Sequence, residues 1–342
     1  MNRKPAGKMT ALALVLGALV LIAVRAPATA APITLTYANF PPASTFPCVQ
    51  MERWSREVEK RTNGQVKINT FPGGTLLAAK NIFDGVISGT ADIGNFAMSY
   101  QPGRFPVSEA ADLPLGLPNA RVASLVLTDL IEKHQPKEFE KVKILTLFTC
   151  PPADFMTSKP VRTLKDLKGM ELRVSGTGVD VVKNLGGIPI AMPQSETPEA
   201  IQKGIVKGIV SSMEVLKDMN YAAYCPYATD TSLFIVSFAV VMNREKWNAL
   251  PADVKKVMDD LRVEQAEWTG KYVDNHVSEA LSWSKQKYNH QVIELPAADK
   301  AEIKKLVRPM IDAYVKKVSA QGLPGAEIIA DIERLTKKYD KK

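Results

Sequence analysis

Two hydrophobic periodicities alternate along this chain, and the alternation limits the fold more than any other feature. Residues 33–40 (ITLTYANF) alternate apolar and polar side chains as a half-buried strand does, whereas residues 46–64 place apolar side chains at helical spacing. The pattern continues with strand-like residues 65–74, helix-like residues 75–90 and strand-like residues 91–99. This β-α-β-α-β order predicts a parallel sheet whose strands are joined by crossover helices.

The same pattern starts again after a proline-rich segment. Strand-like residues 142–150 lead into PPADFMTSKP at 151–160, which we expect to cross between two lobes. Further strands are expected at 167–176, 188–193 and 208–213, with helices at 179–187 and 195–208. The β-rich residues 233–243 are expected to return to the first lobe. We therefore predict an α/β fold of two lobes that share one cleft, because open α/β sheets bind ligands at the carboxyl ends of their strands.

The last part of the chain has a helical pattern. Residues 251–290 begin at Pro251 and contain no later proline, so they predict one long helix, or two stacked helices, across the backs of both lobes. Residues 298–338 predict two amphipathic helices. The predicted division is a leader at 1–30, a first lobe at 31–151 and about 240–280, and a second lobe at 152–239 and about 281–342, with crossing strands and the long helix joining the lobes.

The N-terminus has the order of features that is typical of an export signal. Arg3, Lys4 and Lys8 come before an uncharged run at 9–24, and small residues follow up to Ala30. The run is shorter than the ~20 residues that a membrane-spanning helix needs. We therefore expect cleavage after Ala30 and a location in the periplasm, with a membrane anchor as the alternative.

Charge and cysteine content exclude several classes of protein. Loss of residues 1–30 removes four basic residues and no acidic residue, so the net charge falls from +8 to +4. The remaining charges are mixed, whereas a nucleic-acid-binding protein would carry a clustered basic face. The three cysteines and three histidines lack the spacing of a metal site, so we expect no metal and no cofactor. The cysteines are expected as buried thiols, with a Cys48–Cys150 disulfide as the alternative in an exported protein.

One arginine stands out by its surroundings. Arg173 lies in the strand-like MELRV and is followed by the small residues Ser175 and Gly176. A guanidinium group is planar and permanently charged, so it can bind a carboxylate through two parallel hydrogen bonds. The small residues leave room for such a ligand to approach. Taken alone, however, an arginine in a strand is more commonly a surface residue.

The chain as a whole resembles the periplasmic solute-binding proteins of tripartite ATP-independent periplasmic (TRAP) transporters, of the C4-dicarboxylate-receptor type. The resemblance extends over nearly all of residues 33–320 and depends on the order of motifs such as EVEKRTNGQVKINTFPGGTL, DLPLGLP, KPVRTLKDLKGMELRVSG and LGGIPIAMPQSETPEAIQKGIVKGI. It implies a bilobed receptor, which we expect to be a monomer, that captures a small organic carboxylate and delivers it to TRAP membrane permease subunits. It also implies that Arg173 binds the carboxylate of the solute.

Three departures from the family pattern bear on the identity of the solute. Pro198 stands where the family commonly has a tyrosine, and Lys207 and Ser211 stand in place of a common acidic residue and a ligand-binding asparagine. The segment before TSKP has no second arginine, which members that bind highly polar acids often carry. These differences favour a weakly polar monocarboxylate with an aromatic or branched tail over C4-dicarboxylates and sialic acid.

Other residues are candidates for the same site. Asn95, Ser211 and Ser212 lie near predicted strand ends and could donate hydrogen bonds to the solute, or serve only as turn and packing residues. Most small-molecule sites also have largely apolar walls. The residues expected to supply these walls, each of which is otherwise a core residue, are Phe40, Phe46, Phe96, Cys150, Phe155, Met213 and Tyr221.

Two other functions stay open at this level. One is a secreted α/β enzyme that acts on a carboxylate, although the chain has no G-x-S-x-G stretch and we expect no enzymatic activity. The other is a receptor that passes its solute to a signalling partner instead of a permease.

Overall fold

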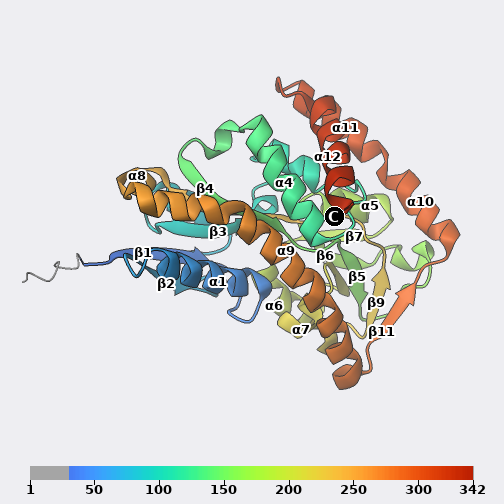
Figure 1. Ribbon diagram of the computed structural model, residues 1–342. Helices are drawn as coiled ribbons and strands as arrows, with labels where there is room; N and C mark the ends of the chain where they lie inside the picture. Colours follow the sequence, from blue (N-terminus) through green and yellow to red (C-terminus); the bar gives the residue numbers. More distant parts are fainter. Residues whose placement is uncertain (1–30, 342) are drawn as a thin grey trace, which may run out of the picture. The chain divides into compact units, whose positions relative to one another are not determined.

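The computed structural model describes residues 31–341, so the predicted leader at 1–30 lies outside the described residues. The unit Pro32–Lys342 contains two β-sheets (Figure 1). The first sheet has the strand order β2-β1-β3-β10-β4, with β1 (Ile33–Asn39), β2 (Val66–Phe71), β3 (Ile93–Ala97), β4 (Val142–Thr149) and β10 (Ser237–Asn243). The second has the order β11-β9-β5-β8-β6-β7, with β5 (Asp154–Thr157), β6 (Glu171–Val174), β7 (Ile188–Ala191), β8 (Gly208–Ser211), β9 (Tyr227–Asp230) and β11 (Gln291–Glu294). Each sheet with the helices packed on it is one lobe, and the predicted two-lobed α/β fold is confirmed.

Each sheet is parallel except for one strand, which is the strand that arrives from the other lobe. In the first sheet β10 runs antiparallel to β3 and β4, and in the second sheet β5 runs antiparallel to β8 and β9. The chain leaves β4 at the carboxyl edge of its sheet and passes into β5, and it returns from β9 into β10 in the same way. A strand that enters at the carboxyl edge must run opposite to its neighbours. The parallel pairing predicted for residues 33–99 is confirmed in β1, β2 and β3, whereas the two crossing strands, for which no direction was predicted, are antiparallel. The crossings lie beside the carboxyl edges of both sheets.

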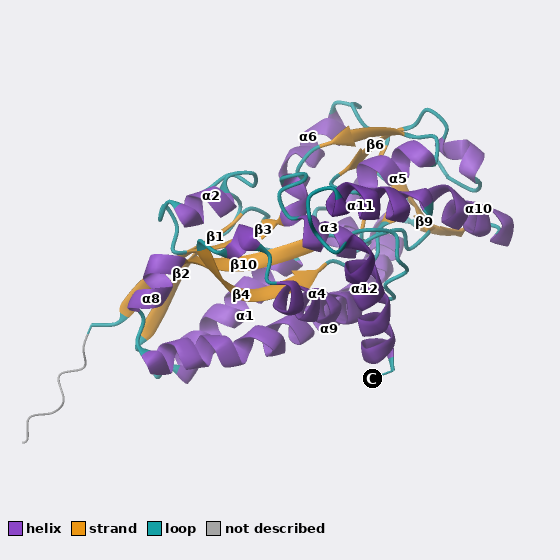
Figure 2. Ribbon diagram, turned by 90° about the horizontal axis from the view of Figure 1, so that it is seen from above, coloured by secondary structure: helices purple, strands orange, loops and turns teal. Residues whose placement is uncertain are grey.

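The long helix α9 (Ala252–Tyr288) is continuous and packs on both lobes (Figure 2). It contacts β4, α1 (Phe46–Arg61) and α4 (Ala120–His134) of the first lobe and α7 (Val215–Asp218) of the second. It ends at Asn289, whose left-handed backbone (φ 52°) turns the chain toward β11. One helix thus spans both lobes, as one of the two sequence interpretations predicted.

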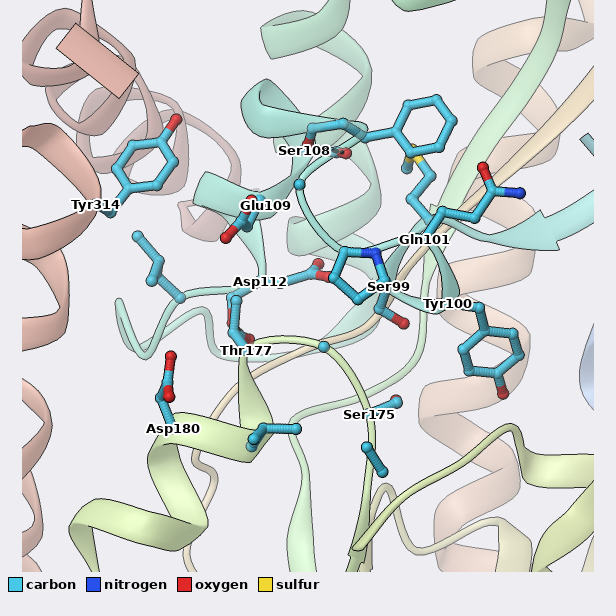
Figure 3. A pocket seen from close by; sticks show the side chains of 18 of the residues that line it. Ser99, Tyr100, Gln101, Ser108, Glu109, Asp112, Ser175, Thr177, Asp180 and Tyr314 are labelled. Carbon is cyan, nitrogen blue, oxygen red and sulfur yellow. Dashed lines mark hydrogen bonds between the residues drawn. The ribbon is translucent and has the colours of Figure 1, made fainter. Parts of the chain in front are cut away.

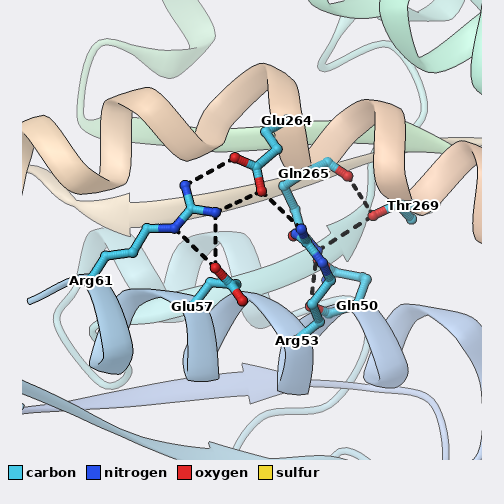
Figure 4. Close-up of polar contacts among 7 residues, drawn as sticks. All are labelled: Gln50, Arg53, Glu57, Arg61, Glu264, Gln265 and Thr269. Carbon is cyan, nitrogen blue, oxygen red and sulfur yellow. Dashed lines mark hydrogen bonds and ion pairs between the residues drawn. The ribbon is translucent and has the colours of Figure 1, made fainter.

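A polar network holds α9 against α1 (Figure 4). Arg53 donates hydrogen bonds to Glu264, at 2.8 Å, and to Gln265, and Arg61 donates to Glu264 at 2.8 Å. The exposed Arg61–Glu264 pair contributes little, because solvent screens such pairs. Gln265 is fully buried and donates to the backbone oxygen of Gln50 at 3.0 Å. Because a buried amide without partners is costly, this bond fixes the register of the two helices.

Several local predictions differ from the structure. The helix expected at 75–90 extends only over α2 (Ile82–Ile87), and the C-terminal residues form three helices in place of two. These are α10 (Ala297–Val307), α11 (Pro309–Ser319) and α12 (Gly325–Asp340). Pro309 explains the extra break, because proline has no N–H for a continuing helix but suits the first turn of a new one. Strands β5, β9 and β11 were not predicted. Each has only four residues and, unlike the equally short β6, β7 and β8, none lies in the alternating strand and helix pattern of residues 167–213.

The C-terminal helices divide their contacts between the lobes. Helix α12 packs on α4 of the first lobe, whereas α10 packs on α5 (Gly178–Asn184) of the second. The lobe boundaries drawn from the sequence remain predictions. The other helices are α3 (Pro106–Ala111), α6 (Thr197–Gln202) and α8 (Arg244–Ala249). Within residues 31–341, no helix is both long and apolar enough to cross a bilayer.

The three cysteines are buried free thiols. Burial raises the pKa of Cys48 and of Cys225 to about 12, which suppresses the reactive thiolate. The thiol of Cys48 donates to the backbone oxygen of Pro41 at 3.2 Å. These residues therefore act as small core side chains, as the default interpretation of the sequence expected.

Candidate functional site

A small cavity lies between the two lobes where strands of both sheets end. Its volume is about 60 Å³. Strand ends of the first sheet contribute Phe40 and Cys150 to its lining, and strand ends of the second contribute Arg173 and Ser212. The strand topology thus brings side chains that are far apart in the sequence to one place. We call this space the Arg173 cavity.

Arg173 is the only basic residue that lines this cavity among the described residues. It lies in β6 with Ile190 of β7 and Ile209 of β8 on either side, and it is 3% exposed. Its Nε and Nη2 atoms donate to the backbone oxygen of Met192 at 3.0 and 2.7 Å. Within residues 31–341 the guanidinium forms no salt bridge, and its Nη1 atom donates no hydrogen bond. A buried guanidinium held in this way is poised to bind an anion.

Glu214 is the second buried ionisable group of the cavity. It follows β8 and is 2% exposed. The hydroxyl of Ser212 donates to its Oε1 at 2.7 Å, whereas its Oε2 is buried without a partner among the described residues. Burial raises the pKa of Glu214 to about 7, because a carboxylate is poorly solvated there.

Aromatic side chains form much of the remaining wall. The rings of Phe40 and Phe238 stack with centroids 6.4 Å apart, and Phe46 meets Phe238 edge-on at 6.0 Å. Tyr100 packs edge-on against Phe40 at 5.3 Å. The cavity thus combines one cation with an aromatic surface, which suits an anion that carries an apolar group.

Some of the predicted site residues meet here and others do not. Phe40, Phe46, Cys150, Arg173, Ser211 and Ser212 line the cavity, whereas Asn95, Phe96, Phe155, Met213 and Tyr221 do not. Asn95 and Phe96 are neighbours in β3, so their side chains point to opposite faces. Asn95 donates to Asn39 at 2.9 Å, and Phe96 packs on Phe83 with ring centroids 4.8 Å apart. Phe155 and Met213 are buried in the cores of the unit, and Tyr221 donates from its hydroxyl to the backbone of Gln194.

Sequence reasoning missed several lining residues, among them Tyr100, Gln194, Glu214, Asp218 and Phe238. Glu214 could have been found, since it is a carboxylate placed just after the predicted strand 208–213. Whether Tyr100 and Phe238 line the cavity depends on how the two lobes pack together, and no local sequence pattern contains that information.

A larger cavity of about 750 Å³ lies next to the Arg173 cavity (Figure 3). It is bordered by α3, by the start of α5 and by α11, and the carboxylates of Glu109, Asp112 and Asp180 line it. Lys317, one of its two lysines, is paired with Glu109 at 3.0 Å. Burial raises the pKa of Asp112 well above its usual range. The larger space matches the usual size of a ligand site, but no arginine lines it among the described residues, and its lysines Lys80 and Lys317 are balanced by Glu109 and Asp180. The smaller cavity contains the buried guanidinium of Arg173 and is therefore the better candidate for a carboxylate site.

A thin wall separates the two cavities and consists of contacts between the lobes. Tyr100 and Ser175 line both spaces. The backbone N–H of Gln194 donates to the hydroxyl of Tyr100 at 2.9 Å, and the hydroxyl of Thr177 donates to the backbone oxygen of Asp112 at 2.8 Å. These bonds join the first lobe to the second across the cleft.

No metal centre accompanies the cavity in the part of the chain that the structure describes. Among residues 31–341, no group of three or more His, Cys, Asp or Glu side chains is placed to hold an ion. The chemistry of the cavity is therefore that of its guanidinium, its carboxylates, its hydroxyls and its aromatic rings.

Comparison with known proteins gives a consistent result. The chain is 52% identical to a TRAP periplasmic solute-binding protein from Desulfovibrio salexigens, and the two structures match with a TM-score of 0.82 over 91% of this chain and 98% of that one. That structure is an open complex with the C-terminus of a symmetry mate bound in its ligand-binding site. It is 26% identical to a marine metagenome TRAP solute-binding protein specific for aromatic acid ligands, solved with metahydroxyphenylacetate, at a TM-score of 0.86 over 90% and 99% of the chains.

A third relative is a C4-dicarboxylate-binding protein. The C4-dicarboxylate-binding periplasmic protein DctP of Rhodobacter capsulatus is 23% identical, over 94% of this chain and 98% of that protein. The model of the family of bacterial extracellular solute-binding proteins, family 7, matches residues 37–317. This match covers most of the chain and confirms the resemblance seen in the sequence, so the protein belongs to bacterial extracellular solute-binding protein family 7, as a solute receptor of the TRAP type.

Proposed function

We propose that this receptor captures a small, weakly polar monocarboxylate in the Arg173 cavity and delivers it from the periplasm to TRAP membrane permease subunits. The observation that carries the proposal is the buried guanidinium of Arg173, which has no carboxylate partner among the described residues. Because a buried charge is costly unless it is paired, a solute carboxylate is the natural partner.

The lining of the cavity supports a monocarboxylate over a dicarboxylate. Among residues 31–341, Arg173 is the only basic residue that lines it, while Glu214 and Asp218 supply carboxyl groups. A second carboxylate on the solute would find no cation and would be repelled by these groups. The rings of Phe40, Phe46 and Phe238 instead favour an aromatic or branched tail.

Two relatives support the same conclusion. The metagenome receptor that is 26% identical is specific for aromatic acid ligands. The Desulfovibrio receptor that is 52% identical holds the C-terminus of a symmetry mate in its ligand-binding site, and a C-terminus carries a carboxylate. By analogy, Arg173 is the group that would receive a carboxylate in this chain.

A thermal-shift screen of the purified protein tests the proposal. A ligand that binds only the native state stabilises it by about 2.7 kcal/mol at a concentration one hundred times its Kd. Benzoate, phenylacetate and 3-hydroxybenzoate should raise the Tm, whereas succinate and malate should raise it less. Benzamide, which keeps the ring but lacks the charge, is the matched control and should have no effect. Larger shifts with the dicarboxylates, or equal shifts with benzamide, would refute the proposed solute class.

A further inference from the structure

Glu214 is a buried acceptor inside a cavity that is proposed to bind an anion. It is 2% exposed, and its Oε2 has no hydrogen-bond partner among the described residues. Arg173 already accounts for the solute carboxylate, so the proposed function leaves Glu214 unused. Buried carboxyl oxygens are almost always hydrogen-bonded in folded proteins, and an exception calls for an explanation.

The neighbours of Glu214 leave acceptors free. The proton of the Ser212 hydroxyl is directed to Glu214 Oε1 at 2.7 Å, so the lone pairs of Ser212 Oγ stay available. The titratable groups around Glu214 are Cys150 at the end of β4, Asp218 on α7, and His276 on α9, which bonds Asp218 at 2.6 Å. The Cys150 thiol and the Asp218 carboxyl group carry no positive charge, and the ring of His276 is hydrogen-bonded to Asp218. When Glu214 is ionised, the pair Ser212–Glu214 thus offers acceptors to the cavity and no free donor.

We infer that Ser212 and Glu214 form a second polar subsite in the Arg173 cavity, and that it selects carboxylates which also carry an O–H or N–H hydrogen-bond donor. This inference rests on the proposed function, because Arg173 must first bind the solute carboxylate. A donor on the solute would satisfy Glu214 Oε2, which has no partner among the described residues. The same subsite rejects a second carboxylate, because two carboxylates would repel each other there.

Calorimetric titration with matched probes tests the subsite. The probes are 3- and 4-hydroxybenzoate, each compared with the fluorobenzoate of the same substitution pattern, because fluorine is similar in size to a hydroxyl group but cannot donate. A hydrogen bond to a charged acceptor corresponds to about tenfold or more in affinity. The wild-type protein should therefore bind at least one hydroxybenzoate about tenfold more tightly than its fluorine analogue.

Variants assign that preference to Glu214. In Glu214→Gln the free acceptor becomes an amide group that can donate, so the ratio of the two dissociation constants should fall toward one. Glu196→Gln is the control, because Glu196 is exposed and does not line the cavity, and it should keep the wild-type ratio. Circular dichroism verifies that each variant is folded. If Glu214→Gln does not fold, Glu214→Asp, which withdraws the carboxylate by one methylene, should lower the ratio in the same direction.

The outcomes separate this inference from the proposed function. Equal affinity of the wild-type protein for hydroxyl and fluorine analogues refutes the subsite and leaves the carboxylate clamp intact. A preference for the hydroxyl group that persists unchanged in the Glu214 variants places donor recognition elsewhere and also refutes the subsite. Failure of all probes, including benzoate, to bind would contradict the proposed function itself.

Discussion

Arg173 and Glu214 are ionisable side chains buried in the same cavity, and their environments give them different tasks. Arg173 sits in a strand of the second sheet, where the backbone of Met192 holds its Nε and Nη2 atoms. A guanidinium keeps its charge even when buried. The carboxyl group of Glu214, by contrast, has a pKa that burial raises to about 7. One group is therefore a permanent cation, which we propose as the receptor of the solute carboxylate, and the other is a weak acid.

Gly176, in the second lobe, lies against Ser99 of the first lobe. Its φ of +56° is in the left-handed region, and a Cβ at this position would lie 2.7 Å from the Cβ of Ser99 in the opposite lobe. Gly176→Ala should therefore force the lobes apart and weaken solute binding about tenfold or more. The strained backbone should also lower the free energy of unfolding by about 1–2 kcal/mol. Calorimetric titration measures the solute affinity, and urea denaturation measures the free energy of unfolding.

Gly169→Ala is the matched control for this change. Gly169 also has a positive φ, +72°, but a Cβ there meets no atom within 4 Å. It should lose similar stability while keeping its solute affinity. If both variants bind the solute equally well, the Gly176–Ser99 contact has no part in closure.

At the residue scale, the sequence indicated candidate site residues by the chemical type of the side chain and by its position near a predicted strand end. Arg173 lies in a strand pattern before small residues, which made it a candidate, but its assignment to the solute carboxylate came from the family resemblance. Asn95 and Phe96 were selected on the same kind of position, but they lie deeper in β3 and outside the cavity. A shift of two or three residues along a strand changes which face and which end a side chain occupies, and sequence patterns do not determine strand ends that finely.

Helix α1 obtains its N-terminal cap from the other lobe. No side chain of its own caps it, and its first turn contains no acidic residue. The carboxylate of Asp218, on α7, instead accepts from the N–H of Phe46 at 3.2 Å and bonds His276 of α9 at 2.6 Å. A carboxylate at a helix N-terminus is stabilised by the helix dipole. Asp218 thus connects three elements and both lobes.

This connection predicts a pH dependence of stability. The hydrogen bond with Asp218 raises the pKa of His276, and Glu279 acts in the same direction, whereas the nearby Lys217 opposes it. A histidine whose pKa is raised by folding contributes its full stabilisation below its unfolded pKa, about 6.5, and loses it as the pH rises through the higher folded pKa. The stability difference between wild type and His276→Gln should therefore be largest near pH 6 and shrink toward pH 9.

Urea denaturation at several pH values measures this difference. A hydrogen bond between charged groups, about 1.5–3 kcal/mol, sets the scale expected at low pH. Asp154 and Glu214, whose pKa values burial raises to about 7, are present in both proteins and largely cancel in the comparison. A difference that stays constant from pH 6 to pH 9 would show that His276 is not charged in the folded protein.

At the element scale, the long periodic segments were predicted, whereas short elements were predicted only in part: the four-residue strands β6, β7 and β8 were expected, and β5, β9 and β11 were not. The helix α9 and the strands β1 and β4 repeat their pattern over enough residues to be recognised. Helix α8 has six residues and lies between a strand and a proline, so its period was hidden. The antiparallel direction of β5 and β10 depends on where the chain crosses between sheets, and that is a property of the tertiary fold.

At the scale of the whole unit, we propose that one lobe closes on the other over the solute. Few hydrogen bonds cross the cleft, and each involves single polar groups such as those of Tyr100 and Thr177. Such bonds contribute modestly to stability, so a bound solute can shift the balance between open and closed arrangements. The sequence predicted two lobes and a shared cleft, but not these contacts, because they depend on how two separate sheets meet.

Thr177→Val tests the link between closure and binding. Thr177 lies outside the Arg173 cavity, and its hydroxyl bonds Asp112 of the first lobe at 2.8 Å. Loss of one such bond costs about 0.5–1.5 kcal/mol, so the solute affinity should fall about two- to twelvefold although no solute contact is altered. Small-angle scattering should also show a smaller radius of gyration for the wild-type protein when it is saturated with solute. An unchanged affinity together with an unchanged radius would argue against closure.

The most direct test of the account is the affinity of Arg173 variants for the carboxylate that gives the largest thermal shift. Removal of one member of a buried charge pair costs about 2–5 kcal/mol, so Arg173→Ala should weaken binding by roughly thirty- to several-thousand-fold. Arg173→Lys should restore binding only in part, because an ammonium group cannot make the planar two-pronged contact. Arg162→Ala, a change at an exposed arginine outside the cavity, is the control and should bind as wild type does. If folded Arg173→Ala binds the solute within about threefold of wild type, a loss far below that of a broken buried pair, Arg173 is not the carboxylate receptor and the account is wrong.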